Sequence, residues 1–166
     1  MTQHDLLDRV KDAKMYQTNF LIWKEQWDAY HDLIPLNWKC VKFEASNRNQ
    51  IPTKTGIYAF FVEPRIAGFP SHGYLMYIGE TGQDSHHHLQ KRFDDYLQDQ
   101  KRTKRVHIHL MLNLWDSYLY FYYVEIDSNQ INLKTLEQTL LDTFTPPFVK
   151  RGFSIRIGNV IKGLGR

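Results

Sequence analysis

Residues 56–63 have the sequence GIYAFFVE, which is apolar at nearly every position and long enough for one β-strand. Apolar side chains on both faces are typical of a strand in the middle of a sheet. The next ten residues, 64–73, include two prolines and two glycines and predict a long loop. Residues 74–79, YLMYIG, then predict a returning strand. The two segments together predict an antiparallel hairpin with a generous connection.

Downstream of the hairpin, helical and extended patterns alternate. Residues 85–100 predict an amphipathic helix with a buried stripe, and residues 132–144 predict a second helix that Pro146 and Pro147 would end. The aromatic segment 118–126 predicts a third strand. In residues 106–114 apolar and polar side chains alternate, and this period of two predicts a further strand.

The N-terminal third has a different character. Residues 2–15 and 19–33 predict helices, residues 38–44 predict a strand, and residues 45–55 predict a polar loop. We therefore expect an N-terminal helical extension over residues 1–50 and one domain over residues 51–166. The fold class predicted for the chain is α/β, in its α+β form.

The composition narrows the classes of protein that fit. The chain has 166 residues and a single cysteine, Cys40, so it cannot form an internal disulfide. It lacks the Cys and His spacing of a structural zinc site. No apolar run has the length of a membrane span, and the N-terminus lacks the apolar core of a signal peptide. We expect a cytoplasmic protein without a membrane partner.

Positive charge is concentrated in residues 101–105 and in the segment after Asp142, although the net charge of the chain is only +3. No acidic residue follows Asp142, whereas several basic residues do. Such stretches attract a polyanion because they neutralise phosphates and release counterions. The alternative is an ordinary solvated surface. The candidate nucleic-acid contacts are His87, Lys91, Lys101, Arg102, Lys104, Arg105, Lys150 and Arg151.

Two side chains on the predicted helices suit the hydrolysis of a phosphodiester. Glu137 lies at the edge of an apolar stripe, where a carboxylate needs a partner, and one Mg²⁺ ion with its waters is such a partner. Arg92 carries a permanent planar charge that matches a phosphate, and Tyr96 follows it on the same helix face. The ordinary alternatives are a carboxylate paired with a surface lysine and an arginine that covers the rim of the core.

Tyr58 and Tyr77 lie on the two strands of the predicted hairpin, so their hydroxyls could meet at one water molecule. A phenol is a poor base at neutral pH unless a cation or metal lowers its pKa. Ordinary packing of sheet tyrosines is the alternative for either residue alone.

In this order the motifs resemble those of the GIY-YIG endonuclease family. They are GIY at residues 56–58, MYIGETG at 76–82, LQKRFDDY at 89–96 and LEQTLL at 136–141. The resemblance implies a three-stranded antiparallel sheet flanked by helices and one divalent cation, Mg²⁺ or Mn²⁺, bound by Glu137. It also implies that Tyr58 acts as the general base or positions the water with help from Tyr77. By the same resemblance Arg92 stabilises the scissile phosphate, and Tyr96 fills a place where relatives have Tyr or His.

The sequence therefore predicts a divalent-metal-dependent DNA endonuclease, restriction-like or phage-defence-like, with a homodimer as one way to gain specificity. RNA stays open as a substrate. The alternative is a non-catalytic nucleic-acid-binding module that keeps the fold. Its motivation is Glu80, where many relatives have lysine, and Val149, where the family usually has asparagine; Asn159 is a candidate substitute.

Overall fold

The protein is a mixed α/β structure built on one antiparallel sheet, described by a computed structural model for residues 3–31, 34–84 and 86–165, with only the backbone of residues 3–7. The four strands have the order β1-β4-β2-β3. They are β1 (Lys39–Lys42), β2 (Gly56–Val62), β3 (Tyr74–Thr81) and β4 (Leu119–Glu125). The predicted hairpin and third strand are confirmed, but the prediction of a three-stranded sheet is wrong because β1 pairs with β4 as a fourth strand.

The strand β2 is central and pairs with β3 on one side and β4 on the other. Six of its seven residues are buried, which explains why apolar side chains occupy both of its faces. The strand β3 is at the edge of the sheet, so one side of its backbone has no neighbouring strand.

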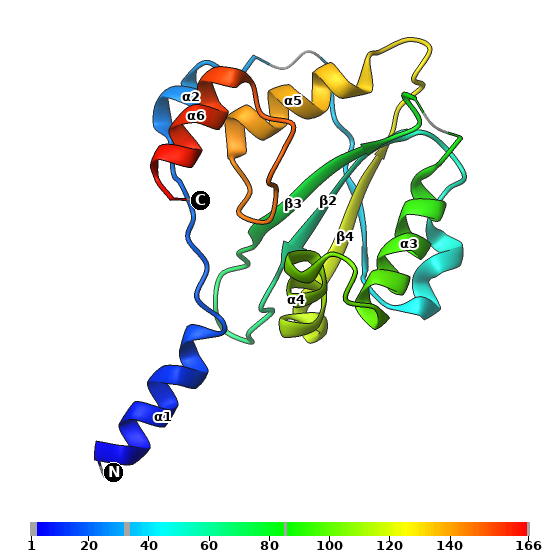
Figure 1. Cartoon of the computed structure of the whole chain (residues 1–166). Helices are drawn as coiled ribbons and strands as arrows, with labels where there is room; N and C mark the ends of the chain where they lie inside the picture. The colour runs from blue at the N-terminus through cyan, green and yellow to red at the C-terminus, as the bar shows by residue number, and fades with distance from the viewer. Residues whose placement is uncertain (1–2, 32–33, 85, 166) are drawn as a thin grey trace.

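Helices cover both faces of the sheet (Figure 1). The helices α3 (Leu89–Lys101) and α4 (Val106–Leu114) share one core with Tyr58, Phe60 and Phe121. The helix α5 (Leu133–Phe144) shares a second core with Ile57, Ala59 and the other alternate residues of the strands. Two short 3₁₀ helices, η1 (Ala45–Gln50) and η2 (Asp116–Tyr118), connect the strands to these layers. The predicted helix over 132–144 is confirmed, with Asn132 as its N-cap.

The prediction of a strand over residues 106–114 is wrong, because this segment forms α4. Its buried residues are Ile108, Met111 and Leu112, which have the i, i+3, i+4 spacing of one helix face. Val106 and Leu110 fit the alternating pattern but are exposed. The same apolar residues satisfied both periods, and burial against the neighbouring α3 selects the helix.

The N-terminal region has less helix than predicted. The helix α1 (Gln3–Lys14) agrees with the prediction for residues 2–15 and projects from the body in Figure 1. The predicted helix over 19–33 is wrong, since only α2 (Lys24–Asp28) is helical there and residues 32–33 lie outside the described residues. Its aromatic side chains do not form one stripe: Phe20 packs on Tyr74 and Tyr30 packs on Phe144. Because these aromatic side chains pack at separate places, they favour an extended segment along the body of the protein.

Residues 1–50 contribute β1 to the sheet, and the division of the chain at residue 50 stays a prediction. One helix boundary and one whole helix also differ from expectation. The helix α3 begins at Leu89, after His88, whose side chain accepts a hydrogen bond from the backbone N–H of Lys91; the predicted start at Ser85 lies outside the described residues. The helix α6 (Ile155–Gly163), capped by Ser154, was not expected.

Two glycines allow close approaches that the strands need. A Cβ atom at Gly56 would overlap the carbonyl oxygen of Val124 on β4. A Cβ atom at Gly79 would overlap the phenol of Tyr58, which lies directly opposite on β2. The ring of Tyr58 therefore occupies the space that any other residue at position 79 would fill.

We expect Gly79→Ala to lower the free energy of unfolding by about 1–3 kcal/mol, because the new methyl group must displace a buried ring. Urea unfolding followed by circular dichroism measures this loss. The matched control is Gly158→Ala on α6, where the nearest atom to the added Cβ is 3.8 Å away. This control should gain up to about 1 kcal/mol from helix propensity. A Gly79→Ala protein as stable as the parent would contradict the seat described for Tyr58.

Candidate active site

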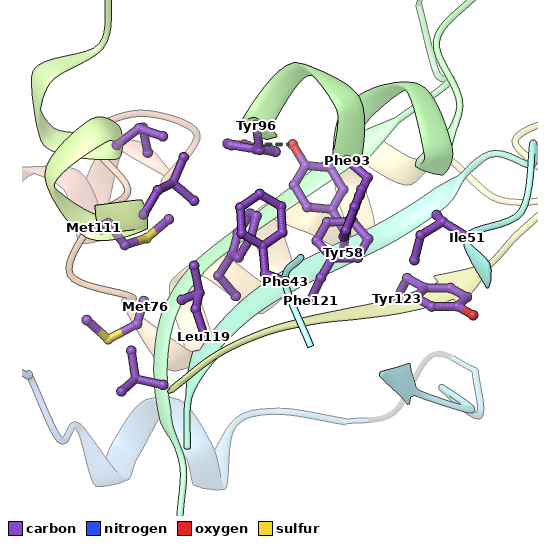
Figure 2. Packing of buried hydrophobic residues seen from close by; sticks show 14 of the residues in the cluster. Phe43, Ile51, Tyr58, Met76, Phe93, Tyr96, Met111, Leu119, Phe121 and Tyr123 are labelled. Carbon is purple, nitrogen blue, oxygen red and sulfur yellow. Dashed lines mark hydrogen bonds between the residues drawn. The ribbon is translucent and has the colours of Figure 1, made fainter. Parts of the chain in front are cut away.

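Three tyrosines from three elements meet on the α3 face of the sheet. The rings of Tyr58 on β2 and Tyr77 on β3 stack with centroids 6.3 Å apart and planes 20° from parallel. Tyr96 on α3 contacts both rings edge-on, at centroid distances of 5.7 Å and 5.9 Å. Its hydroxyl is 3.1 Å from that of Tyr58, a hydrogen bond drawn as a dashed line in Figure 2. Two sequence motifs and the following helix thus form one phenol cluster.

Tyr58 and Tyr96 are almost completely buried. Burial, followed by the neighbouring phenol of Tyr77, raises the pKa of Tyr58 well above its usual value. Burial and the phenol of Tyr58 raise the pKa of Tyr96 in the same way. Both phenols are therefore protonated at neutral pH, and either hydroxyl can be the donor in the hydrogen bond between them. Tyr77 is only partly buried and is the member of the cluster that reaches the surface.

Arg92 on α3 places a positive charge beside these phenols. Burial would lower the pKa of Arg92, but the phenols of Tyr58 and Tyr96 outweigh this effect and its pKa is raised. Its closest carboxylate is that of Asp95, with an N–O distance of 3.8 Å. Its Nε–H is buried and has no hydrogen-bond acceptor among the described residues. The guanidinium is thus permanently charged and only weakly paired.

Glu137 reaches the same region from α5. Its carboxylate accepts a hydrogen bond of 3.2 Å from the backbone N–H of Glu80, which points outward from the edge strand β3. Burial and then the negative charge of Glu80 raise the pKa of Glu137 to about 7, although the Glu80 N–H and the charge of Arg92 favour ionisation. No ion pair within 4.0 Å joins Glu137 to a basic side chain of the described residues.

The four residues that sequence spacing singled out are brought together at the edge of β3. The charges of Arg92 and Glu137 both act on the buried phenol of Tyr58, and Arg92 also acts on Glu137. Glu137 lines an open hollow of about 400 Å³. The other residues of this hollow are Asn132, Lys134, Thr135, Gln138 and Gly152, so Tyr58, Tyr77 and Arg92 do not line it.

A divalent cation fits the donor chemistry of Glu137. A half-buried carboxylate with a like-charged neighbour and no basic partner is stabilised when a cation approaches. Among the described residues no group of three or more His, Cys, Asp or Glu side chains could enclose a metal ion. A single carboxylate suits Mg²⁺, which keeps several waters and takes few protein ligands.

The predicted nucleic-acid contacts fall into separate groups. His87 and Lys91 lie near Arg92 and face Asp95, at 3.6 Å and 2.7 Å respectively. Lys101, Arg102 and Lys104 are exposed where α3 ends, and Lys150 and Arg151 are exposed after α5. Arg105 is different, because its guanidinium lies 5.0 Å from the ring centre of Tyr96 and pairs with Asp99.

Two features of the site were missed from the sequence. Glu80 was treated only as a substituted lysine, yet it fixes Glu137 through its backbone and raises its pKa through its side chain. The alternation of side chains along a strand could have indicated the role of Glu80, because Glu80 follows Gly79 and therefore faces α5. No pattern in the sequence indicated that Arg105 would lie over the ring of Tyr96. Val149 is buried in the α5 core, and Asn159 is exposed on α6.

No protein-family model, curated protein or solved structure matches this chain. None of the helices among the described residues has the length and apolar character that crossing a membrane requires.

We expect Glu137→Gln to raise the free energy of unfolding at pH 8 by about 1–3 kcal/mol. The folded state holds the Glu137 proton up to a pH of about 7, above the usual 4.5, so its ionisation destabilises the fold as pH rises through this window. Gln keeps the oxygen that accepts from Glu80 and carries no charge. The gain should therefore vanish near pH 4.

Thermal unfolding at pH 4, 6 and 8 measures this trend, with Glu25→Gln on the exposed face of α2 as the control. Equal stability of Glu137→Gln and the parent at pH 8 would show that the carboxylate is not held in a desolvated, like-charged setting.

Proposed function

We propose that this protein is a divalent-metal-dependent endonuclease of GIY-YIG type that hydrolyses phosphodiester bonds in DNA, restriction-like or phage-defence-like in character. The observation that supports it best is the meeting of four residues near the β3 edge of the sheet, from four motifs on two strands and two helices. They are Tyr58, Tyr77, Arg92 and Glu137. A half-buried carboxylate, a weakly paired guanidinium and hydroxyl donors are the groups that this hydrolysis needs.

In this proposal Glu137 holds Mg²⁺ or Mn²⁺, which would supply Lewis-acid chemistry and activate a bound water. Arg92 binds a non-bridging oxygen of the scissile phosphate and stabilises the charge that develops there. Tyr77, the partly exposed phenol, orients the attacking water or a phosphate oxygen. Tyr58 and Tyr96 hold Tyr77 in place by ring contacts and keep the guanidinium of Arg92 directed at the cluster. The raised pKa of Tyr58 favours this positioning role over that of a base.

The central test is nicking of supercoiled plasmid with Mg²⁺ or Mn²⁺. We expect Glu137→Ala and Arg92→Lys each to lower the cleavage rate by about 100-fold or more, since each removes a group that stabilises the transition state. Tyr58→Phe, which keeps the ring and loses only the hydroxyl, should cost less than Tyr77→Phe. A parent protein that binds DNA and cleaves neither plasmid nor single strands with either metal contradicts the proposed activity.

The pH dependence of cleavage tests the role of Glu137. A proton and a cation compete for this carboxylate, whose pKa is raised to about 7, so cleavage should fall as pH drops through this value. Raising the Mg²⁺ concentration should move the midpoint to lower pH. Glu80→Gln should move it in the same direction, because the like charge that raises the pKa of Glu137 is removed. A midpoint that ignores both changes would argue against Glu137 as the metal ligand.

A second candidate is a non-catalytic nucleic-acid-binding module with the same fold. The buried, protonated phenol of Tyr58 and the carboxylate of Glu80 beside Glu137 favour it, because neither promotes proton removal from water. Binding without cleavage in the plasmid test supports the module.

We place either activity in the cytoplasm, where the single exposed Cys40 would stay reduced. RNA as a substrate and a homodimer as the active species are extensions of the same proposal that oligonucleotide cleavage and light scattering can test.

A further inference from the structure

Arg105 holds an unusual position for a residue of a basic surface run. Its guanidinium lies over the ring of Tyr96, 5.0 Å from the ring centre, and Asp99 on α3 pairs with one of its terminal nitrogens. Burial would lower the pKa of Arg105, but the pairing with Asp99 and the phenols of Tyr96 and Tyr77 hold it raised. The side chain is still 40% exposed. Arg105 therefore presents a fixed, permanently charged fork next to the phenol cluster, from a different segment than Arg92.

Two further basic groups lie beside Arg105. His107 follows in the first turn of α4 and is partly buried. Lys150 reaches this region from the segment after α5, which is held along β3 by a hydrogen bond of 3.1 Å from the N–H of Phe148 to the carbonyl of Met76. The ring of Phe148 also packs on Trp115 at the end of α4.

The positive charges of Arg105 and Lys150 both act on His107. Burial first, then the positive charges of Lys150 and Arg105, lower the pKa of His107. Asp99 is the one carboxylate that pairs with any of the three among the described residues, and no acidic residue follows Asp142 in the sequence. Three basic side chains from two segments thus gather around His107 with little compensation, and Arg105 among them lies over the ring of Tyr96.

We propose that Arg105, His107 and Lys150 form a second phosphate site, which binds a non-scissile phosphodiester of the nucleic-acid strand beside the bond held at Arg92 and Glu137. This inference rests on the proposed function, since it takes the ligand to be a nucleic acid. Arg105 is the anchor, because stacking on Tyr96 and pairing with Asp99 orient its remaining donors, as bidentate phosphate binding requires. Lys101, Arg102 and Lys104 lie in the same basic run but are exposed and have no such contacts in the described residues.

The test is the affinity of the full chain for a fluorescein-labelled 16-base-pair DNA duplex and its single strand, measured by anisotropy in EDTA so that cleavage cannot occur. Arg105→Ala should weaken binding about 10-fold, and the slope of log affinity against log salt should fall by about one, the loss expected for one phosphate contact. Lys150→Ala should show a smaller loss in the same direction, and Arg105→Lys an intermediate one because charge remains while the fork is lost.

Lys104→Ala is the matched comparison, because it removes the same charge one residue away. Lys104 is exposed and lacks the contacts that orient Arg105, so its loss should be smaller, about twofold. Asp99→Asn separates binding from folding, since it breaks the ion pair that Arg105→Ala breaks but keeps the guanidinium. It should lose less affinity than Arg105→Ala, because the guanidinium stays charged and the amide oxygen can still accept a hydrogen bond that orients it. Equal losses for Lys104→Ala and Arg105→Ala, or an unchanged salt slope for Arg105→Ala, overturn the proposal, as does a parent that binds neither DNA.

The two proposals fail separately in this design. Binding that depends on Arg105 without plasmid cleavage in Mg²⁺ or Mn²⁺ supports the phosphate site and removes the proposed activity. Cleavage that depends on Glu137 while Arg105→Ala binds and cleaves normally removes the phosphate site and leaves the activity.

Discussion

The packing of the Tyr58 ring against Gly79 is the contact on which the arrangement of the site depends. Because position 79 lacks a side chain, the ring from β2 can lie across β3 and reach Tyr77 and Tyr96. The hydroxyl pair of Tyr58 and Tyr96 then joins the sheet to α3, the helix that carries Arg92. The absence of a side chain at Gly79 therefore helps to determine where Arg92 places its positive charge.

The parts of the fold that the sequence predicted well are those in which one periodicity dominates. The central strand has apolar residues on both faces, and α5 has a single apolar stripe, so each admitted one reading. The segment 106–114 admitted two, since Ile108 and Leu112 serve a strand and a helix equally, and only contact with α3 decides. The pairing of β1 with β4 joins residues 78 to 84 positions apart, for which local patterns carry no information.

The same distinction applies to the candidate site. Which residues meet could be predicted, because Tyr58, Tyr77, Arg92 and Glu137 lie at fixed places on predicted elements. Their protonation could not, because it depends on depth and neighbours. Tyr58, expected to act as the general base or to position the water, lies deeper than its partner Tyr77, and burial raises the pKa of its phenol. Arg105 departs furthest from expectation, since a residue in a solvated basic run lies over a buried phenol.

The edge position of β3 explains why an energetically costly carboxylate is placed here. An edge strand has outward N–H groups that no neighbouring strand satisfies. Glu137 accepts from one of them at Glu80, so the backbone holds the carboxylate in a partly desolvated place where it is short of positive charge. When Glu137 is ionised, its negative charge therefore lowers the stability of the fold, and the binding of a proton or a cation removes this cost. Above a pH of about 7, where Glu137 is ionised, a cation that binds relieves this unfavourable charge, and below that pH it must first displace the proton.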